Sequence, residues 1–331
     1  MKIKMRSVLA STFIIAAAAG LGCVWWLTEL KKAMDSPIEI GDKPSYLFNI
    51  EKGASLREVA RRFEQNGWLA DSLFLVVHSR LAEHRSIQAG TYRVHTGATP
   101  RELFEMFVAG AVATASITFI EGTTFRDFRK VIAKHPDLKP AWRSLADAEL
   151  LIKLGSEYSS AEGLFYPSTY RFKVGASDAT IYRQAYEAMH RHLHSAWQER
   201  ADNSQLKTPY EALILASIIE KETGSAGERD RIAGVFSRRL ERGMKLQTDP
   251  TVIYGLGESF DGNLTRKHLR DDTPYNTYTR FGLPPTPIAL PSRAAMVAAL
   301  NPAAGKSLYF VAKGDGSHQF YATLREHNRA V

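Results

Sequence analysis

The hydrophobic positions of this chain form one continuous run near the N-terminus and periodic patterns after it. Residues 7–27 carry no charge, and three cations lie in the six residues before them. A helix over this run reaches about 30 Å, the thickness of the hydrocarbon core of a bilayer, and cations before a span favour the cytoplasmic side. The pattern predicts a cytoplasmic tail at residues 1–6 and a single-pass membrane anchor at 7–28, with the rest of the chain outside the cytoplasm.

Two other interpretations of this run remain open. They are a cleaved signal peptide, for which "AAAAGLG" offers small residues, and a lipid-modified Cys23. Apolar residues continue through Leu27, beyond a cleavage point in that segment, which favours an uncleaved anchor. Lys31 and Lys32 beyond the span weaken the charge asymmetry. The polar stretch at 29–45 predicts a linker next to the membrane.

Three later segments share the pattern Gly-x-Ser/Thr-x-Arg-acid-apolar. They are "GASLREV" (53–59), "GATPREL" (97–103) and "GTTFRDF" (122–128), and each follows a short strand-like run. The pattern predicts a glycine turn and a helix start in which the Ser or Thr is the N-cap and the acid three residues on completes a capping box. The first unit resembles a LysM module, a small βααβ glycan-binding fold, although any strand-turn-helix unit with a capping box would look similar. We therefore expect a LysM-like subdomain at residues 46–115.

The segment "LILASIIEKETG" (213–224) is apolar until it reaches Glu220 and Glu222. On a helix both acids share their faces with apolar residues, and a helix that is apolar on nearly all sides is buried. Burial of a carboxylate without a partner raises its pKa, which suits a general acid. The alternative is a structural ion pair with one of the nearby cations, which are Lys221, Arg229, Arg231 and Lys245. The segment alone leaves both roles open.

Two segments that follow carry polar and aromatic groups. The first, "MKLQTDPTVIYGLG" (244–257), predicts a short strand and a polar turn, and the second, "PYNTYTRFGLPPTPIALP" (274–291), predicts a rigid loop. Aromatic faces and amide groups suit packing against sugar rings and hydrogen bonding to their N-acetyl groups, although a long surface loop has similar composition. The candidate contacts are Gln247, Thr248, Asp249, Tyr254, Asn276 and Tyr278.

Composition excludes several classes of function. The net charge of +8 is spread along the chain, which favours a solvated basic surface over a site for an anionic polymer. The sequence has no nucleic-acid module, no glycine-rich phosphate loop and no paired Cys/His spacing. We therefore expect no cofactor, no metal and no nucleic-acid partner. The single cysteine excludes an internal disulfide framework.

The long motifs resemble one known family. "LASIIEKETGSAGERDRIAGVFSRRLERGMKLQTDPTVIYGLG", "YNTYTRFGLPPTPIALP", "LYFVAKGDGSHQF" and "EGLFYPSTYRF" are similar to the MltG (YceG-like) family of endolytic murein transglycosylases. The resemblance implies an α+β chain with a mixed α/β catalytic domain at 116–331, held at the bacterial inner membrane with that domain in the periplasm. It also implies peptidoglycan as substrate and penicillin-binding synthases as neighbours. Ser168 stands where the family usually has an acid.

The resemblance also implies a chemistry. It assigns the catalytic role to the first acid of the "EKE" motif, Glu220, which would protonate the β-1,4 bond between N-acetylmuramic acid and N-acetylglucosamine. It would then deprotonate the muramic C6 hydroxyl, giving 1,6-anhydro ends and terminating nascent strands. Glu222 is expected either to contact the substrate and stabilise its positive charge or to serve the fold. A muramidase using Glu222 or Asp249 as a second carboxylate, and a wall-binding scaffold without activity, remain the alternatives.

Overall fold

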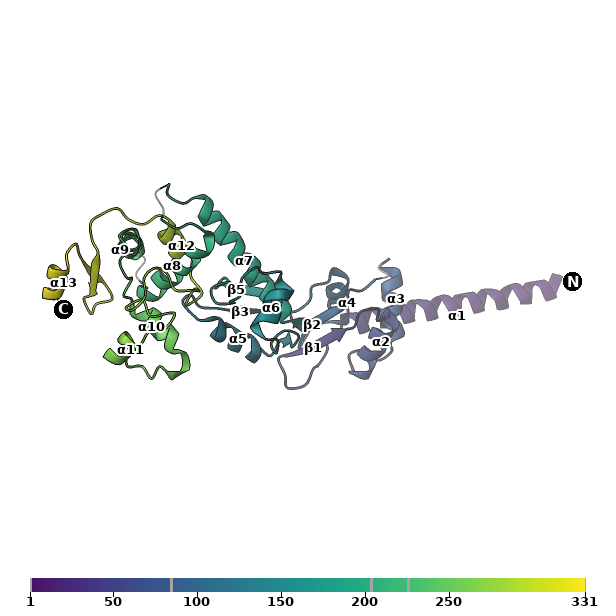
Figure 1. Cartoon of the computed structure of the whole chain (residues 1–331). Helices are drawn as coiled ribbons and strands as arrows, with labels where there is room; N and C mark the ends of the chain where they lie inside the picture. Colours follow the sequence, from purple (N-terminus) through teal and green to yellow (C-terminus); the bar gives the residue numbers. More distant parts are fainter. Residues whose placement is uncertain (1, 84–85, 203–204, 225–226, 331) are drawn as a thin grey trace. The chain divides into compact units, whose positions relative to one another are not determined.

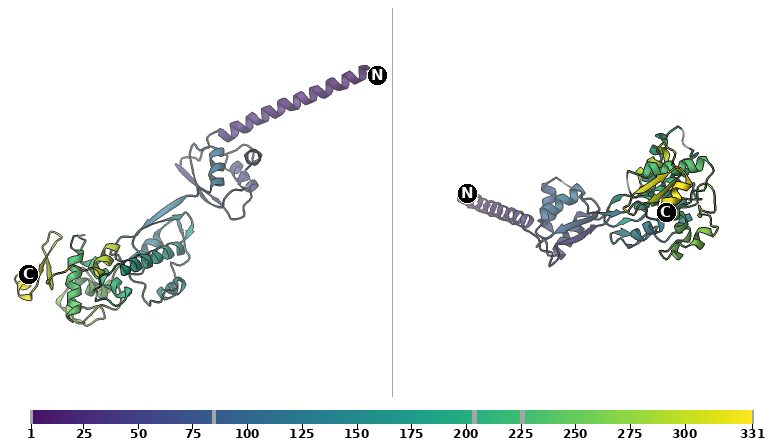
Figure 2. Two further views of the ribbon diagram at one scale, coloured as in Figure 1. Left: turned by 90° about the horizontal axis from the view of Figure 1, so that it is seen from above. Right: turned by 90° about the vertical axis from the view of Figure 1, so that its left-hand side faces the viewer.

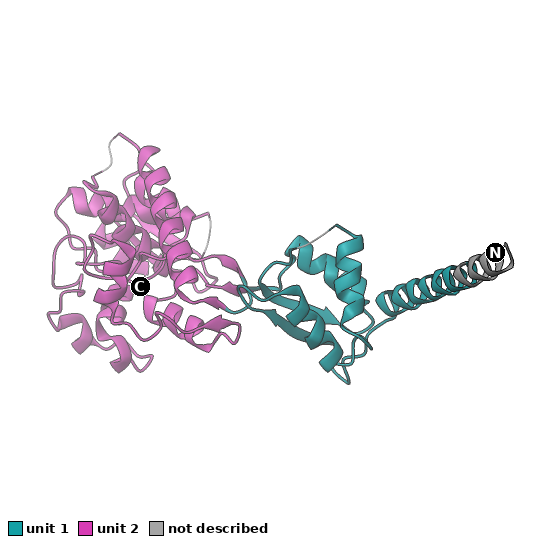
Figure 3. Cartoon of the chain, turned by 90° about the vertical axis from the view of Figure 1, so that its right-hand side faces the viewer, with its two compact units in different colours: residues 1–115, 173–175 teal, residues 116–172, 176–331 magenta. Residues whose placement is uncertain are grey.

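The computed structural model describes residues 2–83, 86–202, 205–224 and 227–330, so the ends of the predicted tail and catalytic domain, residues 1 and 331, lie outside the described residues. The chain divides into two compact units (Figure 3). Unit 1 comprises residues 1–115 with 173–175, and unit 2 comprises 116–172 with 176–331. Both contain helices and strands, which confirms the prediction of an α+β chain.

Unit 1 begins with α1, Lys2–Asp35, one unbroken helix (Figures 1 and 2). Within the described part of the chain, its segment Phe13–Asp35 is the one helix long and apolar enough to cross a membrane, as the predicted anchor requires. The helix continues into the predicted linker. Leu30 and Met34 are four residues apart, so they lie on one face of the helix, and both are buried in the core of unit 1. The segment that follows the apolar run is therefore helical as far as Asp35.

The remainder of unit 1 is a two-stranded sheet with three helices. Strand β1, Ser45–Ile50, pairs antiparallel with β2, Gly90–His95, and α2, Leu56–Gln65, and α3, Leu73–Leu81, lie between them in sequence. Helix α4, Pro100–Ala109, follows β2. The core contains a cluster of aromatic side chains, which includes Phe48, Phe63, Trp68, Tyr92 and Phe107. The strand and helix order is the predicted βααβ order, while the resemblance to LysM modules stays a prediction.

The helix starts predicted from the repeated motif are confirmed. Ser55, Thr99 and Thr124 each accept a hydrogen bond from the backbone N–H three residues on, at the starts of α2, α4 and α5 (Phe125–Lys134). Glu102 completes a capping box by accepting from the backbone N–H of Thr99 at 2.8 Å. These caps satisfy N–H groups that have no partner within the helix.

Unit 2 contains small sheets and a cluster of helices. Strand β3, Thr114–Thr118, pairs with β5, Thr169–Lys173, and most residues of both belong to unit 2. The other strands are β4, Leu138–Lys139, parallel to β6, Ala176–Ser177; and β7, Tyr309–Ala312, antiparallel to β8, His318–Tyr321. Its other helices are α6, Asp147–Leu154; α7, Ala179–Gln198; α8, Pro209–Glu222; α9, Arg229–Glu241; α10, Asp249–Leu256; α11, Arg266–Arg270; α12, Arg293–Leu300; and α13, Leu324–Ala330, with a 3-10 turn at Gly257–Ser259.

Helix α8 forms the core of unit 2. Every residue from Ala212 to Ile219 is buried, and the helix packs against α7, α9, α10 and α12 (Figure 1). The prediction of a buried helix is confirmed. The short strand predicted in 244–257 is wrong, because this segment forms α10, with Thr248 at the N-cap position and Pro250 in the first turn, where proline favours a helix start.

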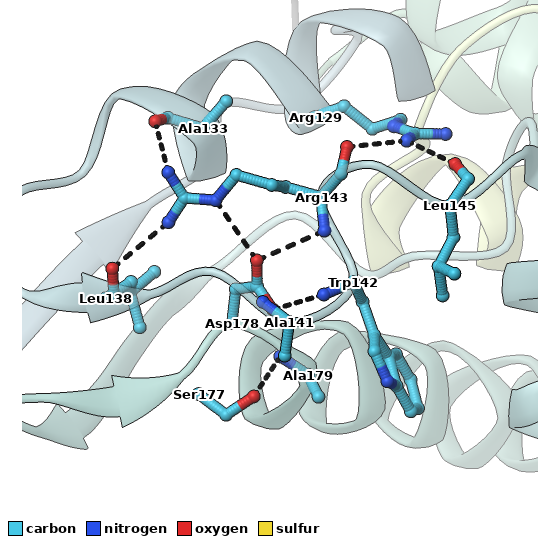
Figure 4. A network of polar contacts seen from close by, with 10 residues as sticks. All are labelled: Arg129, Ala133, Leu138, Ala141, Trp142, Arg143, Leu145, Ser177, Asp178 and Ala179. Atoms are coloured by element: carbon cyan, nitrogen blue, oxygen red, sulfur yellow. Dashed lines mark hydrogen bonds and ion pairs between the residues drawn. The ribbon is translucent and has the colours of Figure 1, made fainter.

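A buried carboxylate fixes the start of α7. The Asp178 side chain is fully buried and accepts hydrogen bonds from the backbone N–H groups of Ala141, Trp142 and Arg143 at 3.0, 2.8 and 3.2 Å (Figure 4). The guanidinium of Arg143 adds a contact of 3.3 Å from Nε. This network joins the loop after β4 to the junction of β6 and α7.

Candidate active site

The last turn of α8 carries both candidate acids. Two residues that are two positions apart on an ideal helix differ by a rotation of about 200°, so Glu220 and Glu222 point to opposite sides of α8. Both lie at the helix C-terminus, where the helix dipole disfavours a negative charge. The surroundings of each acid therefore determine which of them serves the fold and which is available for chemistry.

Glu220 is engaged by other elements of the fold. Its Oε2 accepts hydrogen bonds from the backbone N–H of Ser292 at 2.9 Å and from the Ser292 hydroxyl at 2.5 Å. Its Oε1 lies 3.6 Å from the Arg229 guanidinium, and the Glu220 side chain is only 6% exposed. Ser292 is also the N-cap of α12, since its Oγ accepts from the N–H of Ala295. Glu220 thus joins the end of α8 to the starts of α9 and α12.

Glu222 lies against a cavity of about 350 Å³ on its own side of α8. It accepts a short hydrogen bond from the Thr248 hydroxyl. Burial raises the pKa of Glu222, and the neighbouring Asp249 carboxylate raises it further, while the Thr248 hydrogen bond acts in the opposite direction. Among the ion pairs of the described residues, one includes Glu220 and none includes Glu222.

The other walls of this cavity come from segments distant in sequence. Gln247, Thr248 and Asp249 belong to the start of α10, and the Tyr278 hydroxyl donates to Asp249 Oδ1 at 2.6 Å. Gln247 has a left-handed backbone, φ 51°, and its N–H donates to the carbonyl of Thr277 at 3.1 Å. The turn aligns the start of α10 with the loop at residues 274–291, which contains Tyr275 and Tyr278 and is called the tyrosine loop below. The cavity therefore combines a half-buried carboxyl group, hydroxyl groups, an amide and an aromatic ring, which suits a sugar.

The structure brings together most of the residues predicted from the sequence, but not all of them. Glu222, Gln247, Thr248, Asp249 and Tyr278 line this one cavity, whose lining does not include Glu220.

Two other candidates lie elsewhere. Asn276 is fully buried, and its amide donates to the carbonyls of His268 and Asp271, so it fixes the loop instead of lining the cavity. The Tyr254 hydroxyl donates to Glu162 at 3.2 Å, in a second cavity.

Two polar residues of these sites were missed in the sequence. Arg239 lines the Glu222 cavity and donates to the carbonyls of Leu308 and Leu246, so it holds the wall formed by the β7–β8 hairpin. It stands in a run of arginines on an amphipathic helix, which gives no sign of its burial. Glu162 is also buried, and that burial raises its pKa to about 7. Like Glu222, it adjoins a run of apolar residues, which is the signal that could have found it.

In the part of the chain that the structure describes, no group of three or more His, Cys, Asp or Glu side chains is placed to hold a metal ion. In the Glu222 cavity, a carboxyl group with a raised pKa is suited to proton transfer.

Comparison with known proteins agrees with the motifs. The sequence profile of the YceG-like family matches residues 48–331. An endolytic murein transglycosylase of Bacillus subtilis is 30% identical over 317 residues, which are 90% of this chain and 87% of that protein. One of Streptococcus pneumoniae is 25% identical over 89% of this chain, which spans only 59% of that longer protein. The crystal structure of a yceG-like protein from Listeria monocytogenes is 29% identical, with a TM-score of 0.57 over 87% of this chain and 99% of that one.

The matched region runs from β1 to the C-terminus and includes residues of both units. It contains the two acids of α8, the start of α10 and the tyrosine loop, and the resemblance stated from the sequence is therefore confirmed. This chain belongs to the YceG-like family.

Proposed function

We propose that the chain is a membrane-anchored endolytic transglycosylase of peptidoglycan and that Glu222 is its acid and base. The observation that carries the proposal is the position of Glu222, a half-buried carboxyl group with a raised pKa, on the cavity formed by Thr248, Asp249 and Tyr278. The relatives from B. subtilis and S. pneumoniae, both named endolytic murein transglycosylases, supply the class of reaction.

The geometry favours Glu222 over Glu220, which the sequence predicted as the acid. Glu220 accepts two hydrogen bonds from Ser292 at Oε2 and faces the Arg229 guanidinium with Oε1, so both of its oxygens contact groups of the fold. Glu222 has one hydroxyl partner and borders open space. The contact between Glu220 and Arg229 supports the structural ion pair that the sequence left open as an alternative role for this acid.

The reaction requires one group that gives and then takes a proton. Protonated Glu222 donates to the oxygen that bridges C1 of N-acetylmuramic acid and C4 of N-acetylglucosamine, and the C1–O bond breaks. The resulting carboxylate removes the proton of the muramic C6 hydroxyl, whose oxygen bonds to C1. The products are a 1,6-anhydro end and a free C4 hydroxyl, and no water is consumed. A pKa raised by burial keeps the proton available for the first step.

Asp249 and Tyr278 complete the site on the side of the tyrosine loop. Asp249 accepts from the Tyr278 hydroxyl, so its carboxylate is held in place beside the cavity. A fixed negative group stabilises the positive charge that develops at C1 as the bond breaks. In a muramidase the same carboxylate would instead direct a water molecule to C1.

Helix α1 supplies the proposed anchor in the inner membrane, with the N-terminus in the cytoplasm and the remaining chain in the periplasm. A tethered enzyme reaches glycan close to the membrane, where new strands are made. Cleavage there terminates the elongation of nascent strands, next to the penicillin-binding synthases that make them.

Product analysis tests the reaction. Purified glycan strands are digested with the wild-type chain, and the new ends are identified by mass spectrometry, because anhydro and hydrolysed ends differ by the mass of one water. Anhydromuramic ends support the proposal, and reducing ends with added water would show a muramidase. A wild-type chain that binds strands without cutting them would show a scaffold.

A further inference from the structure

Helix α3 of unit 1 has an exposed apolar side. Leu73 and Leu81, at its two ends, are 57% and 63% exposed. Val77 lies four residues from each of them, so the three side chains line one side of the helix. The opposite side is buried and includes Leu75. Apolar residues gathered on the outer side of a helix indicate a contact with something other than water.

The exposed side lies next to the proposed membrane anchor. Helix α3 packs against α1 and runs across its direction (Figure 1). The ring centroids of Phe74 and Trp26 are 5.9 Å apart. Trp26 is the second-last residue of the uncharged run 7–27, so the proposed span places it at the outer interface of the bilayer, where tryptophan is enriched. Because α3 crosses α1 at this level, α3 lies near the depth of the interface.

The packing of unit 1 turns the exposed side of α3 toward the bilayer. Leu30 and Met34 of α1 are buried in the core of unit 1, and they lie about 6 and 12 Å beyond Trp26 along the helix. The core is therefore on the side of α3 that points away from the membrane. Since Leu75 faces this core, the opposite side of α3 faces the lipid.

The chemistry of this side fits a lipid surface. Leucine and valine side chains enter the boundary between headgroups and acyl chains, where an amphipathic helix lies in the plane of the membrane. Arg80, seven residues from Leu73 and on the same side, is exposed, as are Lys31 and Lys32 on α1 just beyond the uncharged run. Long cationic side chains can bury their methylene groups and extend their charges to lipid phosphates. The acid before the helix, Asp71, accepts from the N–H of Leu73 at 2.7 Å and so serves the helix start.

We propose that α3 lies in the outer interfacial layer of the bilayer, with Leu73, Val77 and Leu81 against the acyl chains and Arg80 among the phosphates. The inference rests on one part of the proposed function, the membrane span of α1, and is independent of the reaction. It gives the chain a second membrane contact besides its anchor, so that unit 1 rests on the bilayer and does not swing about a single helix.

The test measures lipid contact at single positions of the full chain, reconstituted into vesicles of equal amounts of phosphatidylethanolamine and phosphatidylglycerol. The single cysteine is removed by Cys23→Ser, and one nitroxide-labelled cysteine is then introduced at a time. The substitutions are Leu73→Cys and Leu81→Cys on α3, Leu21→Cys in the span and Leu47→Cys as the control. Electron paramagnetic resonance gives the accessibility of each label to O₂, which concentrates in lipid, and to a nickel complex that stays in water.

Leu47 is a matched control for the apolar label itself. It is also an exposed leucine of unit 1, at 41%, but it lies on the face of β1 opposite to that of the buried Phe48 and Ile50. A label that sought lipid only because it is apolar would do so at position 47 as well. Circular dichroism of each labelled chain verifies that its helices are retained.

We expect the labels at positions 21, 73 and 81 to be more accessible to O₂ than to the nickel complex, and the label at position 47 to show the reverse. Aqueous labels at positions 73 and 81 beside a lipid-exposed label at position 21 would overturn the inference and leave the anchor intact. An aqueous label at position 21 would overturn the anchor together with the inference. Equal lipid contact at positions 47 and 73 would also contradict the inference, because unit 1 would then adhere without a preferred side. None of these results bears on strand cleavage, which the product analysis tests separately.

Discussion

Replacing each acid of α8 by glutamine separates the two roles. Glu222→Gln keeps the shape of the side chain and its ability to accept from Thr248, but an amide cannot give up a proton to the glycosidic oxygen. Positioned proton transfer contributes about 10²- to 10⁴-fold to a rate, so we expect strand cleavage to fall by that factor. Glu220→Gln should leave cleavage within about 10-fold of the wild type, because this side chain does not line the catalytic cavity.

The two substitutions should affect the free energy of unfolding in the opposite order, because Glu220→Gln should lower it and Glu222→Gln should not. Glu220→Gln removes the charge that faces the Arg229 guanidinium, which is 14% exposed, and places an NH₂ group where Ser292 or Arg229 donates. Loss of a hydrogen bond to a charged group costs about 1.5–3 kcal/mol. For a unit of this size each kcal/mol corresponds to about 2–4 °C, so Tm should fall by about 3–12 °C.

Glu222→Gln should be neutral or stabilising at neutral pH. The folded state raises the pKa of Glu222, so it binds this proton more tightly than the unfolded state does. The wild-type chain therefore loses stability as pH rises above the unfolded pKa, and the glutamine variant escapes that loss. Cleavage is followed by chromatography of the released ends, and unfolding by circular dichroism of the full chain. An inactive Glu220→Gln with native Tm, beside an active Glu222→Gln, would refute the reasoning and restore the assignment predicted from the sequence.

Three further predictions concern stability. Asp178→Ala should reduce the free energy of unfolding by about 3–5 kcal/mol in denaturant titrations, because three backbone N–H groups and the Arg143 guanidinium lose a fully buried acceptor; a loss under 1 kcal/mol would contradict the network. Folding raises the pKa of Glu162 to about 7. Its contribution to the free energy of unfolding is therefore fully present below the unfolded pKa near 4.5 and is lost as the pH rises to 7. Relative to the wild-type chain, the free energy of unfolding of Glu162→Gln should increase by up to about 3 kcal/mol between pH 4.5 and 7. If the free energies of unfolding of the two chains depend on pH in the same way, Glu162 does not cause the loss of stability. Gly163→Ala should lower Tm, because its backbone has φ +80° and an added Cβ would lie 2.5 Å from Pro287; an unchanged Tm would show that the loop moves freely.

Burial and helix starts could be predicted from the sequence because both depend on local pattern. The unbroken apolar run before Glu220 predicted the buried helix α8, and the repeated Ser/Thr-x-x-acid motif predicted the N-caps at Ser55, Thr99 and Thr124. The prediction of a strand in residues 244–257 was wrong, because a short apolar run with β-branched residues is compatible with both a strand and a helix. The proline of "TDPT" was the signal for a helix start.

The choice between the two acids could not be made from the sequence. Helix periodicity shows that Glu220 and Glu222 face opposite sides, but it does not show which side meets Thr248 and Tyr278. These residues follow Glu222 by 26 and 56 positions, and the chain folds back between them. Arg229 was one of four cations that could have paired with either acid, and only the fold selects its partner.

The two acids also explain why the end of α8 can hold a proton donor at all. Both carboxyl groups lie at the negative end of the helix dipole, within a helix that is otherwise buried, so each charge needs compensation. Glu220 obtains it from Arg229 and Ser292, and these contacts fix the starts of α9 and α12 around the helix end. Glu222 forms no ion pair with a lysine or arginine of the described residues, and its raised pKa favours the protonated form instead. In the proposed function, Glu220 secures the fold and Glu222 exchanges its proton with the substrate. Substituting Ser292 by alanine should therefore lower stability and leave the pH dependence of cleavage unchanged.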